Sequence, residues 1–386
     1  AVGSLALDAN TTGNFNDAFG KSSLSANTTG GSNVAIGSGA LNANTTASNN
    51  TAVGASALND NTTGTQNTAM GAEALDACTT GNQNSSFGGS ALSANTTGSD
   101  NTAIGRATLA LNTTASNNTA VGSSALLSNT TGTSNVAVGA YALDANTTGG
   151  ANIGIGYGSL GSNTTASNNT GIGKDSLSAT STGSDNTGCG AFTLRANSTG
   201  QYNTAVGRGS LIKNTTANFN TGLGYGALYE NTTGANNVAV GAYALDANTT
   251  GQNNVALGKD ALGANTTANN NTAIGHATLF DNTTGAHNTA LGTDALANNT
   301  TADNNTALGR SALVANTTGT QNTSVGAYSL DANTTGGQNT AMGEASLGAN
   351  TTASNNTGIG FHALKVNTTG TQNVAVGALC LDAVTT

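Results

Sequence analysis

The stretch TAVGASALNDNTTGTQN, residues 51–67, is the repeating unit of this chain. It recurs as TAMGAEALDACTTGNQN at residues 68–84, and the pattern runs from Ala1 to Thr386 without an insertion or deletion, giving 23 units. A fixed short period is typical of a solenoid, in which each unit forms one turn and contacts only its neighbours. Because helix-pair repeats need about 33 to 47 residues, a 17-residue unit predicts an all-β solenoid, a β-roll or β-helix.

Two columns of the repeat do not vary. With Thr51 as position 1 and Asn67 as position 17, position 4 is always Gly and position 8 is always Leu. A strand that must turn sharply needs a residue with positive φ or room for a close backbone, and Gly supplies both. The candidate structural ladders therefore include the columns that begin Gly3, Gly20, Gly37 and Leu7, Leu24, Leu41.

The unit predicts one coil of β-structure. Position 3 is always apolar, so Thr-Ala-Val reads as a short strand with positions 1 and 3 facing the interior. Flat segments are expected near position 8 and at positions 11–13, with turns at 4–5 and 14–16. Coils stacked at about 4.8 Å would form a rod of roughly 110 Å.

No linker or charge block interrupts the repeat, which predicts a single elongated domain over residues 1–386. Both ends fall inside a unit. We therefore expect either a segment of a longer protein or subunits that stack end to end.

The Asn and Thr columns admit three interpretations. Stacked side chains can form hydrogen-bonded ladders, which assigns structural roles to Asn16, Asn33, Asn50 and to Thr12, Thr29, Thr46. The recurring Asn-x-Thr also matches the N-glycosylation acceptor. A row of Thr on a flat, weakly charged surface could instead bind ice, although only an Asn-x-Thr row is available for it.

Position 2 is always Ala, Gly or Ser. Since neighbouring strand residues point to opposite faces, an inward position 3 implies an outward position 2. A uniformly small outward column predicts close contact with a second chain. The candidate inter-chain strip begins Ala1, Ala18, Ala35, Ala52, Ala69, and the alternative is a coil too narrow for a larger side chain.

The strand sequences resemble a known family. Val-Ala-Ile-Gly at Val34–Gly37 and Val-Ala-Val-Gly at Val136–Gly139, Val238–Gly241 and Val374–Gly377 are similar to the head repeats of trimeric autotransporter adhesins and to phage tail-fibre repeats. The resemblance implies a left-handed β-roll, with the strand lining its inside, and three chains around a long axis.

Composition and charge exclude several functions. Net charge is −9, only 7% of residues are charged, and no basic stripe suggests nucleic-acid binding. No apolar run has membrane-spanning length. Six of the nine basic residues share position 5, which marks an exposed corner (Lys21, Arg106, Lys174, Arg208, Lys259, Arg310).

Residues with catalytic or ligating chemistry form no pattern. His276, His287 and His362 occupy different positions, and Asp does not recur as calcium-binding repeats require. Cys78, Cys189 and Cys380 are far apart, and Cys189 is expected to replace a core aliphatic side chain. We expect no catalytic residue, metal or cofactor.

The sequence therefore predicts a non-enzymatic structural rod. We expect the shaft of an extracellular fibre, filament or adhesin, at a cell surface or in a virion fibre, that self-associates as a lateral trimer or end-to-end filament. The alternative is an ice-binding or glycan-binding protein that uses a flat Asn-x-Thr face. Neither nucleic-acid binding nor membrane insertion is expected.

Overall fold

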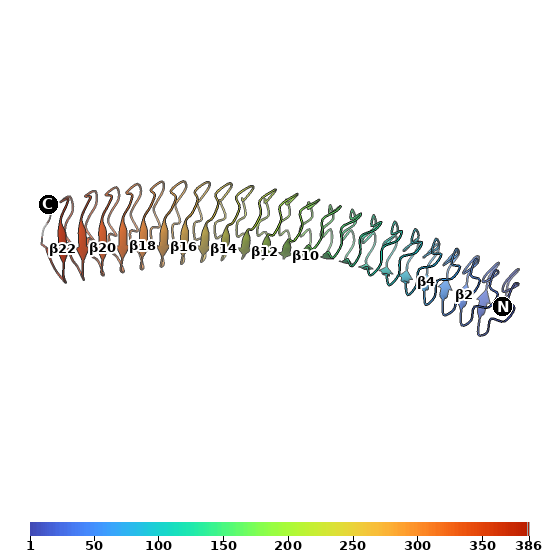
Figure 1. Ribbon diagram of the computed structural model, residues 1–386. Coiled ribbons are helices and arrows are strands. Elements are labelled where there is room, and N and C mark those ends of the chain that lie inside the picture. The colour runs from blue at the N-terminus through green and yellow to red at the C-terminus, as the bar shows by residue number, and fades with distance from the viewer. Residues whose placement is uncertain (384, 386) are drawn as a thin grey trace. The chain divides into compact units, whose positions relative to one another are not determined.

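A computed structural model describes residues 1–383 and 385 of the chain. Those residues contain strands and turns and no helix, and they confirm the predicted β-solenoid with one 17-residue coil per repeat. The chain divides into two compact units, Ala1–Thr199 and Gly200–Thr386. In each unit one three-residue strand follows another on the same side of successive coils (Figure 1).

The strands of the first unit are β1 (Asp17–Phe19), β2 (Val34–Ile36), β3 (Thr51–Val53), β4 (Thr68–Met70), β5 (Ser85–Phe87), β6 (Thr102–Ile104), β7 (Thr119–Val121), β8 (Val136–Val138), β9 (Ile153–Ile155), β10 (Thr170–Ile172) and β11 (Thr187–Cys189). The strands of the second unit are β12 (Thr204–Val206), β13 (Thr221–Leu223), β14 (Val238–Val240), β15 (Val255–Leu257), β16 (Thr272–Ile274), β17 (Thr289–Leu291), β18 (Thr306–Leu308), β19 (Thr323–Val325), β20 (Thr340–Met342), β21 (Thr357–Ile359) and β22 (Val374–Val376).

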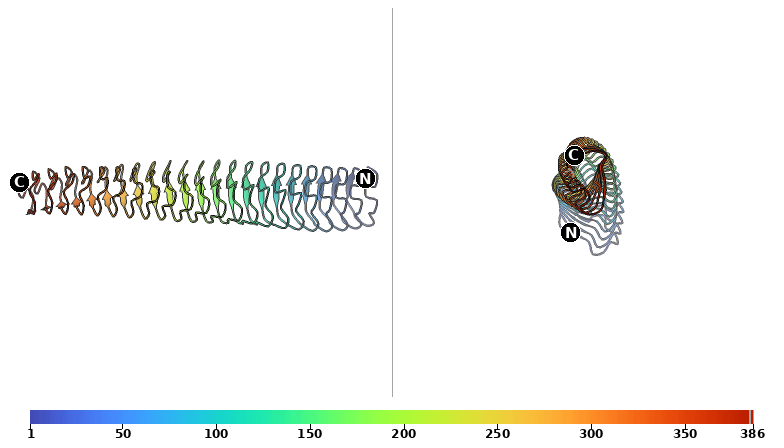
Figure 2. Two further views of the ribbon diagram at one scale, coloured as in Figure 1. Left: turned by 90° about the horizontal axis from the view of Figure 1, so that it is seen from above. Right: turned by 90° about the vertical axis from the view of Figure 1, so that its left-hand side faces the viewer.

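Neighbouring strands within each unit pair in parallel, in a register of one repeat. In the first unit Val34 pairs with Thr51 and Ile36 with Val53, and in the second Thr221 pairs with Val238. Equivalent positions of successive coils therefore lie directly over one another, as the period predicts. Figure 2 shows the same succession of coils from two further directions.

Only positions 1–3 form a strand. The flat segments expected near position 8 and at positions 11–13 are turns and bends instead, although their backbone still bonds to the next coil, as in Thr28 N–H to Thr45 O (2.8 Å). Positions 1 and 3 carry the β-branched and aliphatic side chains that favour strands, whereas positions 5–10 are rich in Ala, Ser and Asp.

The direction predicted for the strand side chains is wrong. Position 2 is the buried one: Ala35, Ala52 and Ala69 are fully buried and Ala18 is nearly so, whereas Ile36 is 44% exposed. Ala1 is exposed in the first coil. A period of two fixes which residues share a face but not which face is inside. From Ala18 onward the position 2 column therefore lies inside its coils and cannot be an inter-chain strip.

The invariant Leu explains why position 2 is small. A Cβ built on Gly154, which occupies position 2 of its coil, would lie 3.2 Å from Cγ of Leu143 in the preceding coil. Leu24 and Leu41 are fully buried and continue this column, while Leu7 in the first coil is half-buried. The coil is too narrow for a larger residue beneath the Leu, which was the alternative explanation of the small column.

The invariant Gly has both of the predicted properties. Gly20 and Gly37 have φ of +138° and +134°, and Gly3 has φ of +138°. A Cβ on Gly20 would also lie 2.6 Å from the carbonyl carbon of Gly37 in the next coil. Close backbone stacking and a left-handed conformation therefore both require glycine here.

The sequence did not reveal the other left-handed positions. Leu24 (φ 52°) and Leu41 (φ 50°) have positive φ, as do most residues at positions 6 and 16, such as Ser56 and Gln66. Such a conformation costs a non-glycine residue about 1 kcal/mol or more. Bonds between coils compensate, since Leu24 N–H donates to Ala40 O (3.0 Å).

Candidate functional site

Two ladders of Asn side chains, most of them fully buried, join successive coils within each unit. Asn16, Asn33 and Asn50 form one of them: Asn33 N–H donates to Asn16 Oδ1 and Asn50 N–H to Asn33 Oδ1, each at 3.0 Å. Each amide also donates forward, as Asn33 Nδ2 does to Ala47 O (2.9 Å). Every such Asn therefore connects its coil to both neighbours.

The second Asn ladder occupies position 11. Asn44 Nδ2 donates to Asn27 Oδ1 of the preceding coil (2.8 Å) and to Ala47 O within its own turn (3.1 Å). Both Asn side chains are fully buried. A sugar on this nitrogen would replace one of its two donated hydrogens and would have no room at a fully buried side chain, so the folded coil does not present the Asn-x-Thr segment as an acceptor.

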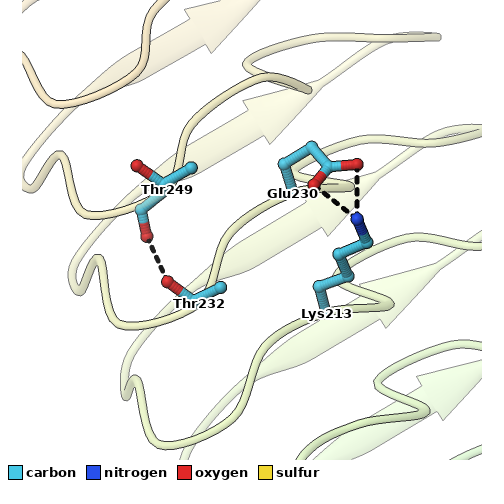
Figure 3. Close-up of polar contacts among 4 residues, drawn as sticks. All are labelled: Lys213, Glu230, Thr232 and Thr249. Carbon is cyan, nitrogen blue, oxygen red and sulfur yellow. Dashed lines mark hydrogen bonds and ion pairs between the residues drawn. The ribbon is translucent and has the colours of Figure 1, made fainter.

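The Thr ladder lies one position away from the column that we predicted. Thr12, Thr29 and Thr46 are exposed. The hydroxyls that join coils belong to the preceding Thr, as in Thr28 Oγ1 to Thr45 O (3.1 Å). Figure 3 shows the same bond from Thr232 Oγ1 to Thr249 O, at 3.0 Å. Adjacent Thr alternate between the two faces, so only one of each pair can form the ladder.

The buried Asn also changes the surface expected to bind ice. In the described coils the Asn side chains of the Asn-x-Thr segment face inward, and the Thr at position 13 faces solvent alone. The flat two-row face that the alternative function requires is therefore not at this segment.

A two-row face exists elsewhere, on the outside of the sheet. In each unit the outer sheet face consists of the first and third residues of its strands, β1–β11 or β12–β22. The third residue is apolar in every strand, and β11 ends in Cys189. Ile104 is 42% exposed, Ile172 39%, and Leu257 44%. A depression of about 470 Å³ at its first strands is lined by residues that include Val2, Phe19, Val34 and Ile36.

Charge is almost excluded from this face and gathers beside it. The first residue of each strand is Thr, Ser, Val or Ile, with Asp17 of β1 the one charged exception. The six basic residues of position 5 are exposed, as predicted, just past the Gly that ends each strand. A polar rim along an uncharged apolar strip is typical of an interaction surface.

Exposed aromatic side chains pair along the position 5 and 6 corner. Tyr141 contacts Tyr157 edge to face with centroids 5.8 Å apart, Tyr225 contacts Tyr243 at 5.2 Å, and Arg310 lies 4.5 Å from the Tyr328 ring. These contacts join adjacent coils. The sequence shows the aromatic residues, but their pairing depends on stacking.

Four carboxylates at position 9 are half-buried, those of Asp76, Asp144, Asp246 and Asp331. Burial raises the pKa of Asp246 to about 6, and the negative charges of Asp260 and Glu230 add to this effect, whereas the backbone N–H groups of Asp246 and Ala247 oppose it. Burial likewise raises the pKa of Asp76, Asp144 and Asp331. The raised pKa therefore belongs to a repeated position rather than to one special site.

Groups with ligating chemistry stay apart. Within residues 1–383 and 385, no three His, Cys, Asp or Glu side chains gather as a metal site would require. Cys78 is buried, and burial raises the pKa of its thiol to about 11. Cys189 is exposed on the outer sheet face, so the expectation that it fills the core is wrong.

No helix among the described residues is long and apolar enough to span a bilayer. The chain matches no protein-family model and no curated protein.

Proposed function

We propose that this chain is a non-enzymatic structural element, the shaft of an extracellular fibre, filament or adhesin at a cell surface or in a virion fibre. The observation that carries the proposal is the set of hydrogen-bonded ladders that joins successive coils within each unit. Its extracellular setting is supported by the likeness of the strand sequences to adhesin and tail-fibre repeats.

One coil boundary of the second unit illustrates the ladders. Thr232 Oγ1 donates to Thr249 O (3.0 Å), and Asn248 Nδ2 donates to Asn231 Oδ1 (2.8 Å). The backbone adds Leu228 N–H to Ala244 O (3.0 Å), and β13 pairs with β14. Figure 3 shows part of this boundary and the exposed ion pair of Lys213 with Glu230.

Such a boundary suits a mechanical role. The bonds between two coils lie side by side, so a pull along the stacking direction loads them together rather than one after another. Because each coil contacts only its neighbours, the stability of the folded chain is approximately the sum of the contributions of the individual coils and of the interfaces between them. A shaft that holds a binding part away from a surface needs this resistance to tension and to proteolysis.

Stretching single molecules tests the proposal. A chain attached by its two ends should resist tension until groups of coils detach, and the isolated folded protein should resist proteolysis within the repeats. The variant Asn129→Asp, which puts a charge into the buried Asn ladder, should lower the unfolding force and open a cleavage site near that coil. A wild-type chain that extends without a force plateau and is cleaved at every coil would contradict a load-bearing role.

A further inference from the structure

The outer sheet face of the second unit contains the longest uninterrupted run of Thr at position 1 of the strands. Six successive strands, β16–β21, begin with Thr, whereas β14, β15 and β22 begin with Val. The third residue of each of the six is apolar and none is aromatic. We call the first and third residues of β16–β21 the Thr strip.

The Thr strip is regular in both directions. Its strands pair in parallel, one repeat apart and without a bulge, as Thr289 with Thr306 and Leu291 with Leu308. Neighbouring strands lie about 4.8 Å apart, and the two outward residues of one strand lie about 7 Å apart. The strip therefore presents hydroxyl and apolar groups on a nearly rectangular lattice.

The fold does not use the hydroxyls of the Thr strip. At position 12 the Thr hydroxyls join coils, as in Thr283 Oγ1 to Thr300 O (3.0 Å) and Thr300 Oγ1 to Thr317 O (3.2 Å). Within the part of the chain that the structure describes, no hydroxyl of the strip has a hydrogen-bond partner in the protein. Thr289 and Thr306 are exposed, so their hydroxyls can donate to and accept from water.

The apolar row of the strip also acts on water. Leu291 (43%), Leu308 (41%) and Met342 (42%) remain exposed. Water beside apolar groups has restricted orientational freedom. The hydroxyls of the neighbouring row can hydrogen-bond to that water at a fixed spacing. Both rows together therefore favour an ordered layer of water on the strip.

We propose that the Thr strip binds ice. The prism face of hexagonal ice has a rectangular lattice of oxygen atoms whose two repeats are close to the two spacings of the strip. Water held on the strip can therefore join the ice lattice. Six strands act together, and each contact that forms holds the next in place, so many weak contacts give a strong attachment. This function is additional to the proposed structural role, and neither depends on the other.

The absence of charge favours an uncharged surface such as ice over an ionic ligand. Neither row of the Thr strip contains a charged side chain. Removing water from a charged group is costly, and a charge on the strip would keep its own hydration shell, which does not fit the ice lattice. Rows without charge avoid that cost.

The size of the strip also favours ice over a protein partner. Six strands and two outward rows cover on the order of 300 Å². Each partner of a standard protein interface contributes roughly 800 Å². An ice crystal sets no such minimum, because its lattice extends outward from any patch of water that is held in place.

Thermal hysteresis of the full chain tests the proposal. The wild-type protein should stop a seeded ice crystal from growing just below its melting point. The double variant Thr289→Tyr, Thr323→Tyr places two bulky rings in the strip and should lose this activity. Tyr favours strands as Thr does, so the variant should fold, which circular dichroism checks.

The same two coils provide a matched control. Thr301 and Thr335, at position 13, are exposed but lie outside the sheet. The double variant Thr301→Tyr, Thr335→Tyr should therefore keep the hysteresis of the wild type. Ice grown in fluorescently labelled wild-type protein should take up the label on its prism faces.

Other outcomes overturn the proposal. A wild-type chain without thermal hysteresis would exclude ice binding. A strip variant as active as the wild type, or a control variant that loses the activity to the same extent as the strip variant, would exclude the Thr strip as the site. Label taken up only on basal faces would exclude the lattice match. The structural role is judged separately, because the force and proteolysis measurements do not depend on ice.

Discussion

The side-chain oxygen of Asn61 is buried without a hydrogen-bond partner, because the next coil places Cys78 where other coils place the donor of the position 11 ladder. The Cys78 thiol donates within its own turn to Gly81 O, at 3.6 Å, and not back to Asn61. The same break recurs where Thr180 follows Asn163, whose oxygen is also unpaired. A buried acceptor without a partner costs about 1 to 3 kcal/mol.

Restoring the ladder should therefore stabilise the chain. We expect Cys78→Asn to raise the unfolding free energy by about 1 to 3 kcal/mol, since its amide would donate to Asn61 Oδ1 and accept from Asn95. Thr180→Asn should act in the same direction. Urea titration followed by circular dichroism measures both. As a control, Cys78→Ser should not gain, and an unchanged midpoint for Cys78→Asn would contradict the ladder's energetic role.

The invariant Gly should not tolerate a side chain. A Cβ at Gly54, where φ is +143°, would lie 2.6 Å from the carbonyl carbon of Gly71. We expect Gly54→Ala to lower the unfolding free energy by about 3 kcal/mol or more. The neighbouring position offers a matched control: a Cβ at Gly89 would meet only Ala72 O, at 4.0 Å. Gly89→Ala should be neutral or stabilising by up to about 1 kcal/mol, and equal losses for the two variants would contradict the stacking argument.

The Thr ladder should matter more than the ion pair beside it. Removing the Thr232 hydroxyl with Thr232→Val should lower the unfolding free energy by about 1 kcal/mol. The loss is no larger because Thr249 O still accepts a hydrogen bond from the Thr232 N–H (3.0 Å). Lys213→Met breaks the exposed 2.6 Å contact with Glu230 and should leave the denaturation midpoint unchanged. The comparison is a single pair of urea titrations, and a larger loss for Lys213→Met would reverse our ranking of the two contacts.

Acidification should stabilise the coil around Asp246. Because the folded state raises the pKa of this carboxyl from 3.8 to about 6, folding binds a proton between those values, and the stabilising contribution is lost as the pH rises through about 6. Asp246→Asn should therefore be more stable than the wild type at pH 7 by about 1 kcal/mol after allowance for solvent screening, and equal to it near pH 3.

A second carboxylate provides the control for that pH profile. Burial raises the pKa of Asp331 as well, but the nearby positive charge of Lys365 lowers it. Asp331→Asn should then gain less at pH 7 than Asp246→Asn does. Thermal melts at several pH values measure both variants, and an Asp246→Asn advantage that persists unchanged at pH 3 would rule out ionisation as its cause.

The fold was predictable because the period acts on every coil at once. Any one coil gives weak local signals, but the repetition of Gly37 and Leu41 at a fixed spacing requires stacking in register. The Asn33 ladder was predictable for the same reason, since stacked amides can bond to one another. The adjacent Thr28 and Thr29 could not be told apart, because both belong to nearly invariant Thr columns and only one faces its neighbouring coil.

The sequence by itself determined the repeat length, the register, the Gly turn and the Leu column, because each of these follows from chemistry that recurs at the same place in every coil. Only the tertiary structure decided which way the strand faces. Closing a coil of seventeen residues around a Leu leaves room for Ala35 inside and turns Val34 and Ile36 outward. The direction of the strand depends on the width of the closed coil, and the pattern along a single strand does not contain that width. The exposed rows of the strand are therefore positions 1 and 3 rather than the Ala column at position 2.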